Sequence, residues 1–255
     1  MRSFITALQF LTRLHICDLP DLTAEDFGRS TRYFPLVGLV LGILQCLIAW
    51  LLIAFMGWTP FTTAVLLLVP LALTGGLHAD GFMDTMDGLL SCRDRARMLE
   101  IMKDSRVGSY GVLALISLLL LEWGMLQTMQ PMTAWLAVFT MPIIGRMAMV
   151  LAVGCFPYAR PEGMGKIFAE MAGRDTIAFA FFCTLLVLVP CGPMALLALS
   201  AGLCFAMLWC HHAAVKLGGL TGDVYGATEL MTEGVALFVL MLVSHAGWSL
   251  HLLWK

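Results

Sequence analysis

Seven apolar stretches divide the sequence and leave little of it for a water-soluble core. They lie at residues 33–56, 60–77, 108–129, 132–154, 176–190, 194–210 and 234–254. Each is long enough, or nearly so, for a helix to cross the roughly 30 Å hydrocarbon layer of a bilayer. Charged residues make up only 13% of the chain, whereas soluble domains carry about 25%. The pattern predicts an all-α polytopic membrane bundle of about seven transmembrane helices.

Basic residues collect in alternate connections between these stretches. Thirteen of the 15 Lys and Arg residues lie within 1–32, 78–107, 155–175 and 211–233. Because cytoplasmic loops of membrane proteins attract Lys and Arg, we expect these four segments and the N-terminus on the cytoplasmic side. The last three are then candidate active-site loops of a single membrane domain that covers residues 1–255.

The N-terminal segment has apolar residues at helical spacing over residues 4–16, which predicts an interfacial helix on the cytoplasmic leaflet. Polar residues interrupt this segment, so we expect no cleaved signal peptide. A net charge of −2 gives no basic field for nucleic acid. The eight cysteines form no CxxC pair and are interpreted as small buried side chains.

An acidic cluster follows the second apolar stretch and carries the strongest functional signal. Asp80, Asp84 and Asp87 are spaced i, i+4, i+7, so a helix would place their carboxylates on one stripe. Like charges at this spacing repel, and a hard cation such as Mg²⁺ would reverse that repulsion. We therefore expect Mg²⁺-assisted phosphoryl chemistry here. Gly81 and Gly88 would let a bulky ligand approach the backbone.

Three polar residues adjoin or interrupt the apolar stretches. His78 points away from the acidic stripe on an ideal helix, and the sequence leaves open whether it caps, packs or carries a proton. Arg146 lies inside the fourth apolar stretch, where an unpaired cation costs several kcal/mol. We expect its partner to be an Asp of the cluster or a substrate phosphate. Glu122, near the outer end of the third stretch, could simply reach the interface.

A second polar segment precedes the third apolar stretch and consists of Lys103, Asp104, Ser105 and Arg106. Cations beside metal-binding carboxylates are what a diphosphate substrate requires, so we expect this segment to contact substrate. The preceding Arg93, Arg95 and Arg97 fit the ordinary bias of cytoplasmic loops toward positive charge.

Two further loops fall on the same side of the predicted membrane. Residues 157–165 combine prolines and glycines around Arg160, which would suit a clamp on a ligand. Residues 218–229 form a glycine-rich segment with Thr221 and Asp223, which is consistent with phosphate or metal contact.

These segments together resemble the cobalamin synthase family over nearly the whole chain. The matching residues are Ala7-Leu8-Gln9-Phe10-Leu11-Thr12-Arg13-Leu14, Phe34-Pro35-Leu36-Val37-Gly38, His78-Ala79-Asp80-Gly81, Asp84-Thr85, Asp87-Gly88, Met102-Lys103-Asp104-Ser105-Arg106, Gly108, Tyr110-Gly111, Arg160-Pro161-Glu162-Gly163, Gly218-Gly219, Thr221-Gly222-Asp223 and Gly226-Ala227. The chain departs from the family pattern at Phe82-Met83 and at His15-Ile16-Cys17, and neither departure touches a predicted ligand.

The resemblance implies an adenosylcobinamide-GDP ribazoletransferase of the inner (cytoplasmic) membrane, with Mg²⁺ as cofactor. The ribose hydroxyl of α-ribazole, or of its 5′-phosphate, would attack the cobinamide-linked phosphate, giving adenosylcobalamin or its phosphate and GMP in vitamin B12 biosynthesis. Asp80, Asp84 and Asp87 would hold one or two Mg²⁺ ions, and Asp87, or as second choice His78, would take the hydroxyl proton. The remaining site residues are Lys103 and Arg106 against the phosphate charge, and Asp104, Ser105, Arg146, Arg160, Thr221 and Asp223 as substrate contacts. Whether the chain forms a homo-oligomer stays open.

Three other classes fit part of the sequence. A CDP-alcohol phosphotransferase has Ala-Arg two residues after its Asp-Gly, whereas Gly81 is followed by Phe82-Met83-Asp84. An intramembrane prenyltransferase of the UbiA kind needs two Asp-rich motifs, and only one is present, with Asp223 isolated. A transporter would carry its acids near mid-membrane, often in repeated halves, and no repeat is visible.

Overall fold

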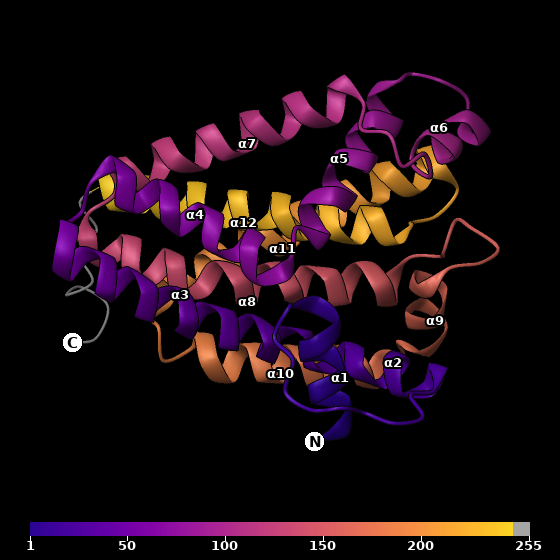
Figure 1. Ribbon diagram of the computed structural model, residues 1–255, viewed down its shortest axis with the longest axis horizontal. Helices are drawn as coiled ribbons and strands as arrows, with labels where there is room; N and C mark the ends of the chain where they lie inside the picture. The colour runs from indigo at the N-terminus through magenta and orange to yellow at the C-terminus, as the bar shows by residue number, and fades with distance from the viewer. Residues whose placement is uncertain (247–255) are drawn as a thin grey trace.

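The computed structural model describes residues 1–246, and helices make up most of this region (Figure 1). The helices are α1 (Arg2–Leu11), α2 (Ala24–Ser30), η1 (Thr31–Tyr33), α3 (Phe34–Met56), α4 (Pro60–Thr74), α5 (Leu77–Leu90), α6 (Arg95–Ile101), α7 (Ser109–Thr128), α8 (Pro131–Cys155), α9 (Met164–Met171), α10 (Arg174–Leu188), α11 (Pro193–Leu217) and α12 (Gly222–His245). Within the described residues, five helical stretches are long and apolar enough to cross a membrane, or up to seven if each of two bent pairs is one span. The predicted all-α polytopic bundle is confirmed.

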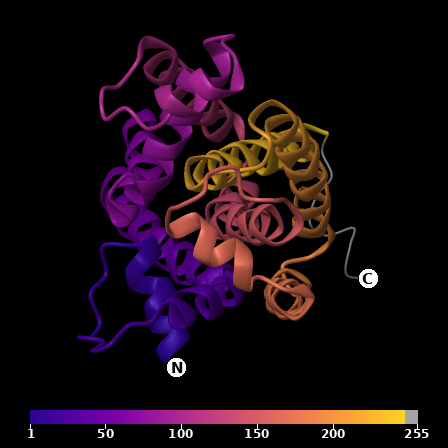
Figure 2. The same ribbon diagram turned by 90° about the vertical axis from the view of Figure 1, so that its right-hand side faces the viewer.

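Helix α8 forms the centre of the bundle, and α3, α10, α11 and α12 pack around it (Figure 2). Most of its apolar sequence is buried inside the protein. Small residues permit this close packing, because a Cβ at Gly145 of α8 would lie 2.8 Å from the Glu233 side chain of α12, and one at Gly202 of α11 would lie 3.1 Å from the Ile144 side chain of α8. Close backbone approach at glycine is the usual way in which membrane helices associate.

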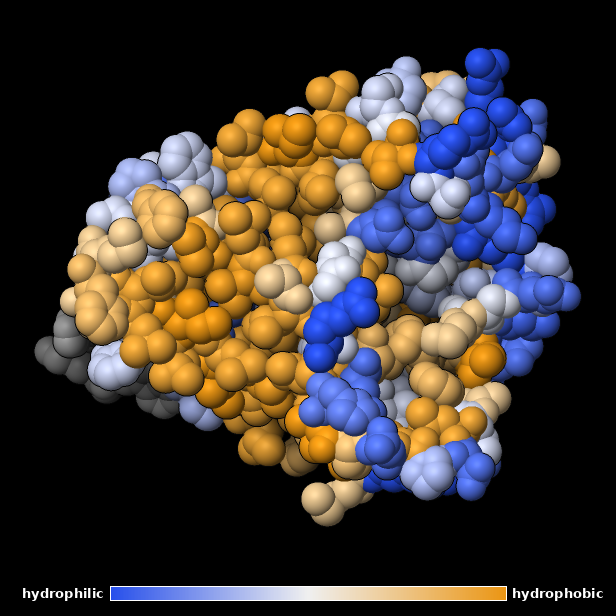
Figure 3. Space-filling view, viewed as in Figure 1, coloured by the Kyte–Doolittle hydropathy of each residue, from blue (hydrophilic) through white to orange (hydrophobic). Residues whose placement is uncertain are grey.

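Two sharp bends place short helices at one end of the molecule. The axes of α4 and α5 meet at 94°, and those of α9 and α10 at 91°. Gly75 and Gly76 form the first bend with φ of 64° and 76°, values that glycine adopts without steric cost. Polar side chains gather at this end, over α5, α6 and α9, whereas apolar side chains cover α3, α4 and α7 (Figure 3). We therefore treat α5 and α9 as lying outside the membrane-spanning segments.

The predicted loop boundaries need correction. Residues 78–107 contain helices α5 and α6, and 155–175 contain α9. Within 211–233 only residues 218–221 lie between helices. Helix α11 continues to Leu217 and is capped by Gly218, which is left-handed with φ 72°. The Thr221 side chain caps the start of α12. The last predicted span, 234–254, is helical to His245, and its end beyond 246 lies outside the described residues. The fifth and sixth apolar stretches form two separate helices, α10 and α11, with residues 189–192 between them.

The N-terminal helix also differs from its prediction. Helix α1 ends at Leu11, and the Arg13 amide instead donates to the Leu73 carbonyl at the end of α4. Its apolar residues Ala7, Leu8 and Leu11 are buried against the rest of the protein. The apolar face that the sequence assigned to the membrane interface is therefore covered by the bundle itself.

Candidate active site

The acidic cluster lies on α5, which packs directly against the beginning of α12. A Cβ at Gly81 would lie 2.9 Å from the Asp223 carbonyl oxygen, and a Cβ at Gly226 would lie 3.1 Å from the His78 Cα. Both glycines are therefore required for contact between the two helices. The position that a side chain at Gly81 would occupy is filled by α12, but Gly81 also lines an inner cavity, so the approach of a bulky ligand there stays a prediction. Gly88 likewise faces the Met102 side chain.

Close packing of α5 and α12 concentrates negative charge around Asp84. Burial, together with the nearby carboxylates of Asp80, Asp223 and Asp87, raises the pKa of Asp84 to about 7, while Arg160 acts in the opposite direction. The sequence placed Asp80 and Asp84 together, and the structure adds Asp223 from a segment about 140 residues further along the chain.

Arg160 reaches Asp223 because their two loops pair at the polar end. The Ala159 amide donates to the Leu220 carbonyl and the Leu220 amide to the Pro157 carbonyl, both at 2.8 Å. Arg160 Nη2 lies 2.8 Å from Asp223 Oδ2, and the Thr221 hydroxyl donates to the same oxygen at 3.2 Å. Three residues that the sequence predicted as substrate contacts are thus brought together.

An outer cavity of about 770 Å³ opens beside this ion pair. Its lining includes Lys103 of the polar segment after α6, together with Arg160, Asp223 and Met164. The cavity presents two cations, Lys103 and Arg160, and three carboxylates, those of Glu100, Glu162 and Asp223. This mixture suits a ligand whose phosphate groups are accompanied by a divalent cation.

Asp87 does not line this cavity, and hydrogen bonds hold its carboxylate against the start of α7. Its Oδ2 accepts the Gly108 amide at 2.8 Å and its Oδ1 accepts the Gly111 amide at 2.9 Å, at the start of α7. Asp87 is buried and lines a different cavity with Asp104 and Arg106. The predicted stripe of three equivalent carboxylates is thus split, because the third one holds the N-terminus of the next helix.

The predicted phosphate-binding segment is divided in the same way. Lys103 lines the cavity of Arg160 and Asp223, whereas Arg106 lines that of Asp87. Arg106 donates to Asp104 at 2.7 Å, and these hydrogen bonds lower the pKa of Asp104 to about 2. Ser105 is exposed. The prediction that Lys103 and Arg106 flank one phosphate is therefore not supported by their positions.

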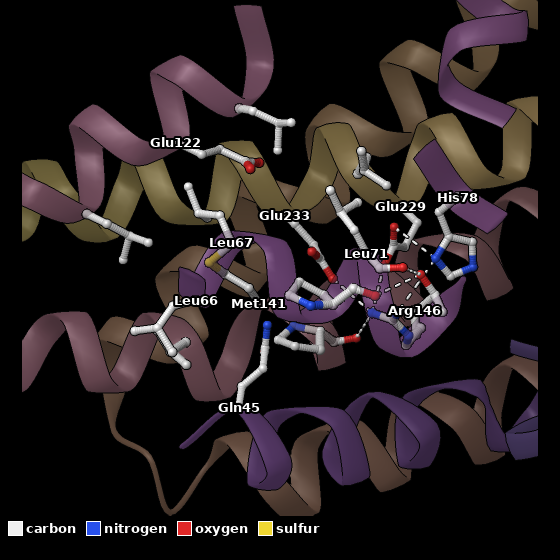
Figure 4. Close-up of a pocket in the computed structure, with 17 residues that line it drawn as sticks. Gln45, Leu66, Leu67, Leu71, His78, Glu122, Met141, Arg146, Glu229 and Glu233 are labelled. Carbon is white, nitrogen blue, oxygen red and sulfur yellow. Dashed lines mark hydrogen bonds and ion pairs between the residues drawn. The ribbon is translucent and has the colours of Figure 1, made fainter. Parts of the chain in front are cut away.

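Arg146 belongs to a buried network of charges between α8 and α12 (Figure 4). Its Nη1 lies 2.6 Å from Glu229 Oε1 and 2.8 Å from Glu233 Oε1. The expected partner in the acidic cluster is wrong, because α12 supplies two carboxylates that already balance the guanidinium. Glu122 is also buried and does not reach the membrane interface. It lines one internal cavity together with Arg146, Glu229 and Glu233.

His78 connects this network to the acidic cluster. Its Nδ1 lies 3.3 Å from Glu229 Oε2 and 3.5 Å from Arg146 Nη2. The ring is buried and faces Glu229 and Arg146 in the bundle interior. Its Nε2 has no hydrogen-bond partner within residues 1–246, and His78 also lines an inner cavity with Asp80 and Asp223.

The donor chemistry at the acidic cluster suits Mg²⁺. Asp80 and Asp84 supply hard carboxylate oxygens, and the hydrogen bonds and ion pairs of the described residues leave both uncommitted. As the side chains stand, no three His, Cys, Asp or Glu residues in the described part of the chain are close enough to share one ion. A cation there would have to draw the carboxylates of Asp80, Asp84 and Asp223 together against their repulsion.

Sequence reasoning missed three residues that build the site. Glu229 and Glu233 are one helical turn apart, and two acids at that spacing opposite a lone intramembrane Arg are a usable signal for pairing. Arg95 was attributed to general loop charge, but its Nε donates to the Leu217 carbonyl at 2.7 Å and so ties α6 to the end of α11. No local pattern distinguishes Arg95 from Arg93 or Arg97.

Comparison with known proteins gives a consistent result over nearly the whole chain. The sequence model described as cobalamin-5-phosphate synthase matches residues 3–241. Three similar proteins each bear the name adenosylcobinamide-GDP ribazoletransferase. That of Desulfitobacterium hafniense is 41% identical over 244 residues, covering 91% of this chain and 94% of the relative. That of Roseiflexus sp. is 41% identical over 239 residues, with coverages of 92% and 88%. That of Chlorobium phaeovibrioides is 37% identical over 238 residues, with coverages of 91% and 94%. No solved structure matches the chain.

Proposed function

The chain belongs to the cobalamin-5-phosphate synthase family, and on this premise we propose that it is a Mg²⁺-dependent adenosylcobinamide-GDP ribazoletransferase. It transfers the adenosylcobinamide phosphate group of adenosylcobinamide-GDP to α-ribazole or α-ribazole 5′-phosphate. GMP is released and adenosylcobalamin or its 5′-phosphate is formed. The structural observation that supports this most directly is the gathering of Asp80, Asp84 and Asp223 near Arg160, which lines the outer cavity together with Lys103.

The reaction exchanges one phosphorus–oxygen bond for another. The ribose hydroxyl oxygen bonds to the phosphorus that carries cobinamide, and the bond from that phosphorus to GMP breaks. Lys103 and Arg160 face the oxygens of the diphosphate and offset their charge. Asp80, Asp84 and Asp223 would hold Mg²⁺, which supplies charge neutralisation at the transferring phosphate when it is bound.

The hydroxyl proton needs an acceptor near the acceptor ribose. Both carboxylate oxygens of Asp87 already accept backbone amides in another cavity, which speaks against it. His78 shares the inner cavity with Asp80 and Asp223, and its Nε2 is free of protein partners in the described region. Arg146 Nη2, which can only donate, lies 3.5 Å from His78 Nδ1, and Glu229 Oε2 lies 3.3 Å from the same nitrogen. Nε2 can accept a proton when Nδ1 donates to Glu229 instead of accepting from Arg146, and in that state we assign the hydroxyl proton to His78.

Orientation in the membrane follows from the distribution of charge. The polar end carries α5, α6 and α9 together with the substrate-facing loops (Figure 3). Since Lys and Arg residues favour the cytoplasmic side, this end and the N-terminus would face the cytoplasm across the inner membrane. Nucleotide and ribazole substrates would then reach the site from the cytoplasm.

The test is GMP release by the purified protein in lipid, with adenosylcobinamide-GDP and α-ribazole 5′-phosphate. GMP and a cobalamin product that depend on both acceptor and Mg²⁺ are expected, and a chelator should abolish them. Asp84→Asn should lower turnover at least about a hundredfold, because it removes one carboxylate from the cluster. Asp175→Asn, at the exposed start of α10, is the matched control and should retain activity. A folded wild-type protein that releases no GMP would overturn the proposal.

A further inference from the structure

A second, inner cavity of about 260 Å³ lies behind the acidic cluster and is lined mostly by carbon. Four aromatic rings from four helices contribute to it, namely Phe10 of α1, Phe34 of α3, Phe168 of α9 and Tyr225 of α12. The ring of Phe168 lies 5.1 Å from that of Phe10 and 5.8 Å from that of Phe34, measured between centroids. Met149 and Val153 of α8 complete the apolar lining. The walls therefore suit a flat apolar ring.

One side of the inner cavity is polar. His78, Asp80 and Asp223 line it there, and His78 is only 3% exposed with its Nε2 lacking a partner among the described residues. A buried nitrogen without a hydrogen bond is costly, which indicates that a ligand group completes this wall. The inner cavity thus has an apolar end for a ring and a polar end for hydroxyl groups.

The inner cavity adjoins the outer cavity that Lys103 and Arg160 line. Asp223 and Met164 line both cavities, so they mark the boundary. Beyond this boundary lie Lys103 and Arg160, which suit phosphate groups. A ligand that extends across both cavities would carry an apolar ring at one end, a sugar in the middle and a phosphate at the other end.

We infer that the inner cavity binds the benzimidazole ring of the acceptor ribazole, an assignment that rests on the proposed function. The ribose then lies beside Asp80, Asp223 and His78, where its hydroxyl meets the phosphate to be attacked. The fused ring is largely carbocyclic, so aromatic and aliphatic walls satisfy it without hydrogen bonds.

The other parts of the substrates fit this cavity poorly. Guanine carries donors and acceptors along its edges, and burial against Phe34, Met149 and Val153 would leave them unpaired at a cost of about 1–3 kcal/mol each. Pockets that enclose drug-sized ligands run from roughly 300 to 1,000 Å³, so 260 Å³ accommodates one fused ring and excludes a corrin macrocycle.

The experiment narrows the cavity and measures each substrate separately. Met164→Trp adds bulk at the boundary, and because Met164 is 48% exposed the change leaves the core intact. Val153→Phe fills the apolar end. Both variants should raise the KM for α-ribazole 5′-phosphate about tenfold or more. Val153→Phe, which lines the inner cavity and not the outer one, should also leave the KM for adenosylcobinamide-GDP within about twofold. Glu170→Trp places the same indole on an exposed position of α9 and should change neither constant.

A measurement of α-ribazole binding tests the inference even for a variant that has no transferase activity. Equilibrium dialysis of α-ribazole against wild-type protein in nanodiscs, without donor or metal, should detect a complex that Met164→Trp weakens about tenfold. Unchanged acceptor KM and unchanged dialysis in an active Met164→Trp protein would overturn the inference. A rise confined to the donor KM would also overturn it, by assigning the cavity to the donor. A folded wild-type protein without transferase activity, by contrast, contradicts the proposed function itself.

Discussion

Arg146 and Glu229 form an ion pair in the interior of the bundle, with Nη1 of the arginine 2.6 Å from Oε1 of the glutamate. Their side chains are 1% and 2% exposed, respectively. The pair joins the central helix α8 to α12, and Glu229 also faces His78 on α5. One carboxylate therefore links the apolar scaffold to the helix that carries the acidic cluster.

Replacement of Arg146 should destabilise the protein strongly. Arg146→Met leaves Glu122, Glu229 and Glu233 buried around one cavity without their cation, and removal of one partner from a buried ion pair costs about 3–5 kcal/mol. Thermal melting in detergent should therefore fall by many degrees. Arg106→Met removes an exposed arginine that pairs with Asp104 two residues away and should leave melting unchanged. Equal melting of the two variants would contradict the structural role of Arg146.

The two glutamates around Arg146 should differ in their effect on catalysis. Glu229→Gln removes the charge that faces His78 Nδ1, and a group that orients a functional histidine contributes about 10- to 100-fold. We expect that loss in kcat, with both KM values nearly unchanged. Glu233→Gln leaves the ion pair between Arg146 and Glu229 in place and should retain most activity. Equal losses in the two variants would show that the network acts only on folding.

Much of the fold follows from the sequence, because the apolar stretches have the length that the bilayer imposes. The boundaries near the site do not follow. A hydropathy pattern treats 211–233 as one polar loop, whereas a left-handed glycine at 218 and the Thr221 cap turn most of it into the ends of two helices. Helix α5 is separated from α4 by the bend at Gly75 and Gly76, and it combines the buried His78 and Asp87 with the exposed Asp80.

The candidate site was predictable where residues act through local spacing. Asp80 and Asp84 are one turn apart, and their proximity requires only that the segment be helical. The addition of Asp223 and the departure of Asp87 depend on the packing of α5 against α12 and α7, which no local pattern encodes. The partner of Arg146 was wrong for the same reason.

Asp87 should contribute more to stability than to chemistry. Asp87→Ala leaves the amides of Gly108 and Gly111 without their acceptor at the start of α7, which costs about 0.5–2 kcal/mol for a lost helix cap. Asp87→Asn keeps one acceptor oxygen and should recover part of that loss. Melting temperature and turnover should be measured together. If Asp87→Asn melts like the wild type but has lost turnover as completely as Asp84→Asn, Asp87 binds metal or substrate directly.

Binding of Mg²⁺ should weaken as the pH falls. The pKa of Asp84 is raised from 3.8 to about 7, so at about pH 6 most of this carboxyl group is protonated and a metal ion must displace the proton. We expect the Mg²⁺ concentration for half-maximal turnover to rise about tenfold from about pH 8 to about pH 6, and to level off above about pH 8. Turnover titrated with Mg²⁺ at several pH values measures this. A requirement independent of pH would show that Asp84 is ionised throughout or is not a ligand.

Gly81 should be needed for activity because of the helix that it contacts. A methyl group at Gly81→Ala would lie 2.9 Å from the Asp223 carbonyl oxygen and 3.0 Å from its Cα, so α5 and α12 would have to move apart. That movement separates Asp80 and Asp84 from Asp223, and misplacement by about 1 Å can cost about a hundredfold in rate. Gly124→Ala is the matched control on α7, because nothing lies within 4 Å of its added methyl group and alanine favours a helix by about 1 kcal/mol. Turnover and melting of both variants should be compared. We expect Gly81→Ala to lower turnover and to raise the Mg²⁺ concentration that turnover requires, because the carboxylates are moved apart. If Gly81→Ala retains full turnover, the contact between α5 and α12 has no catalytic importance.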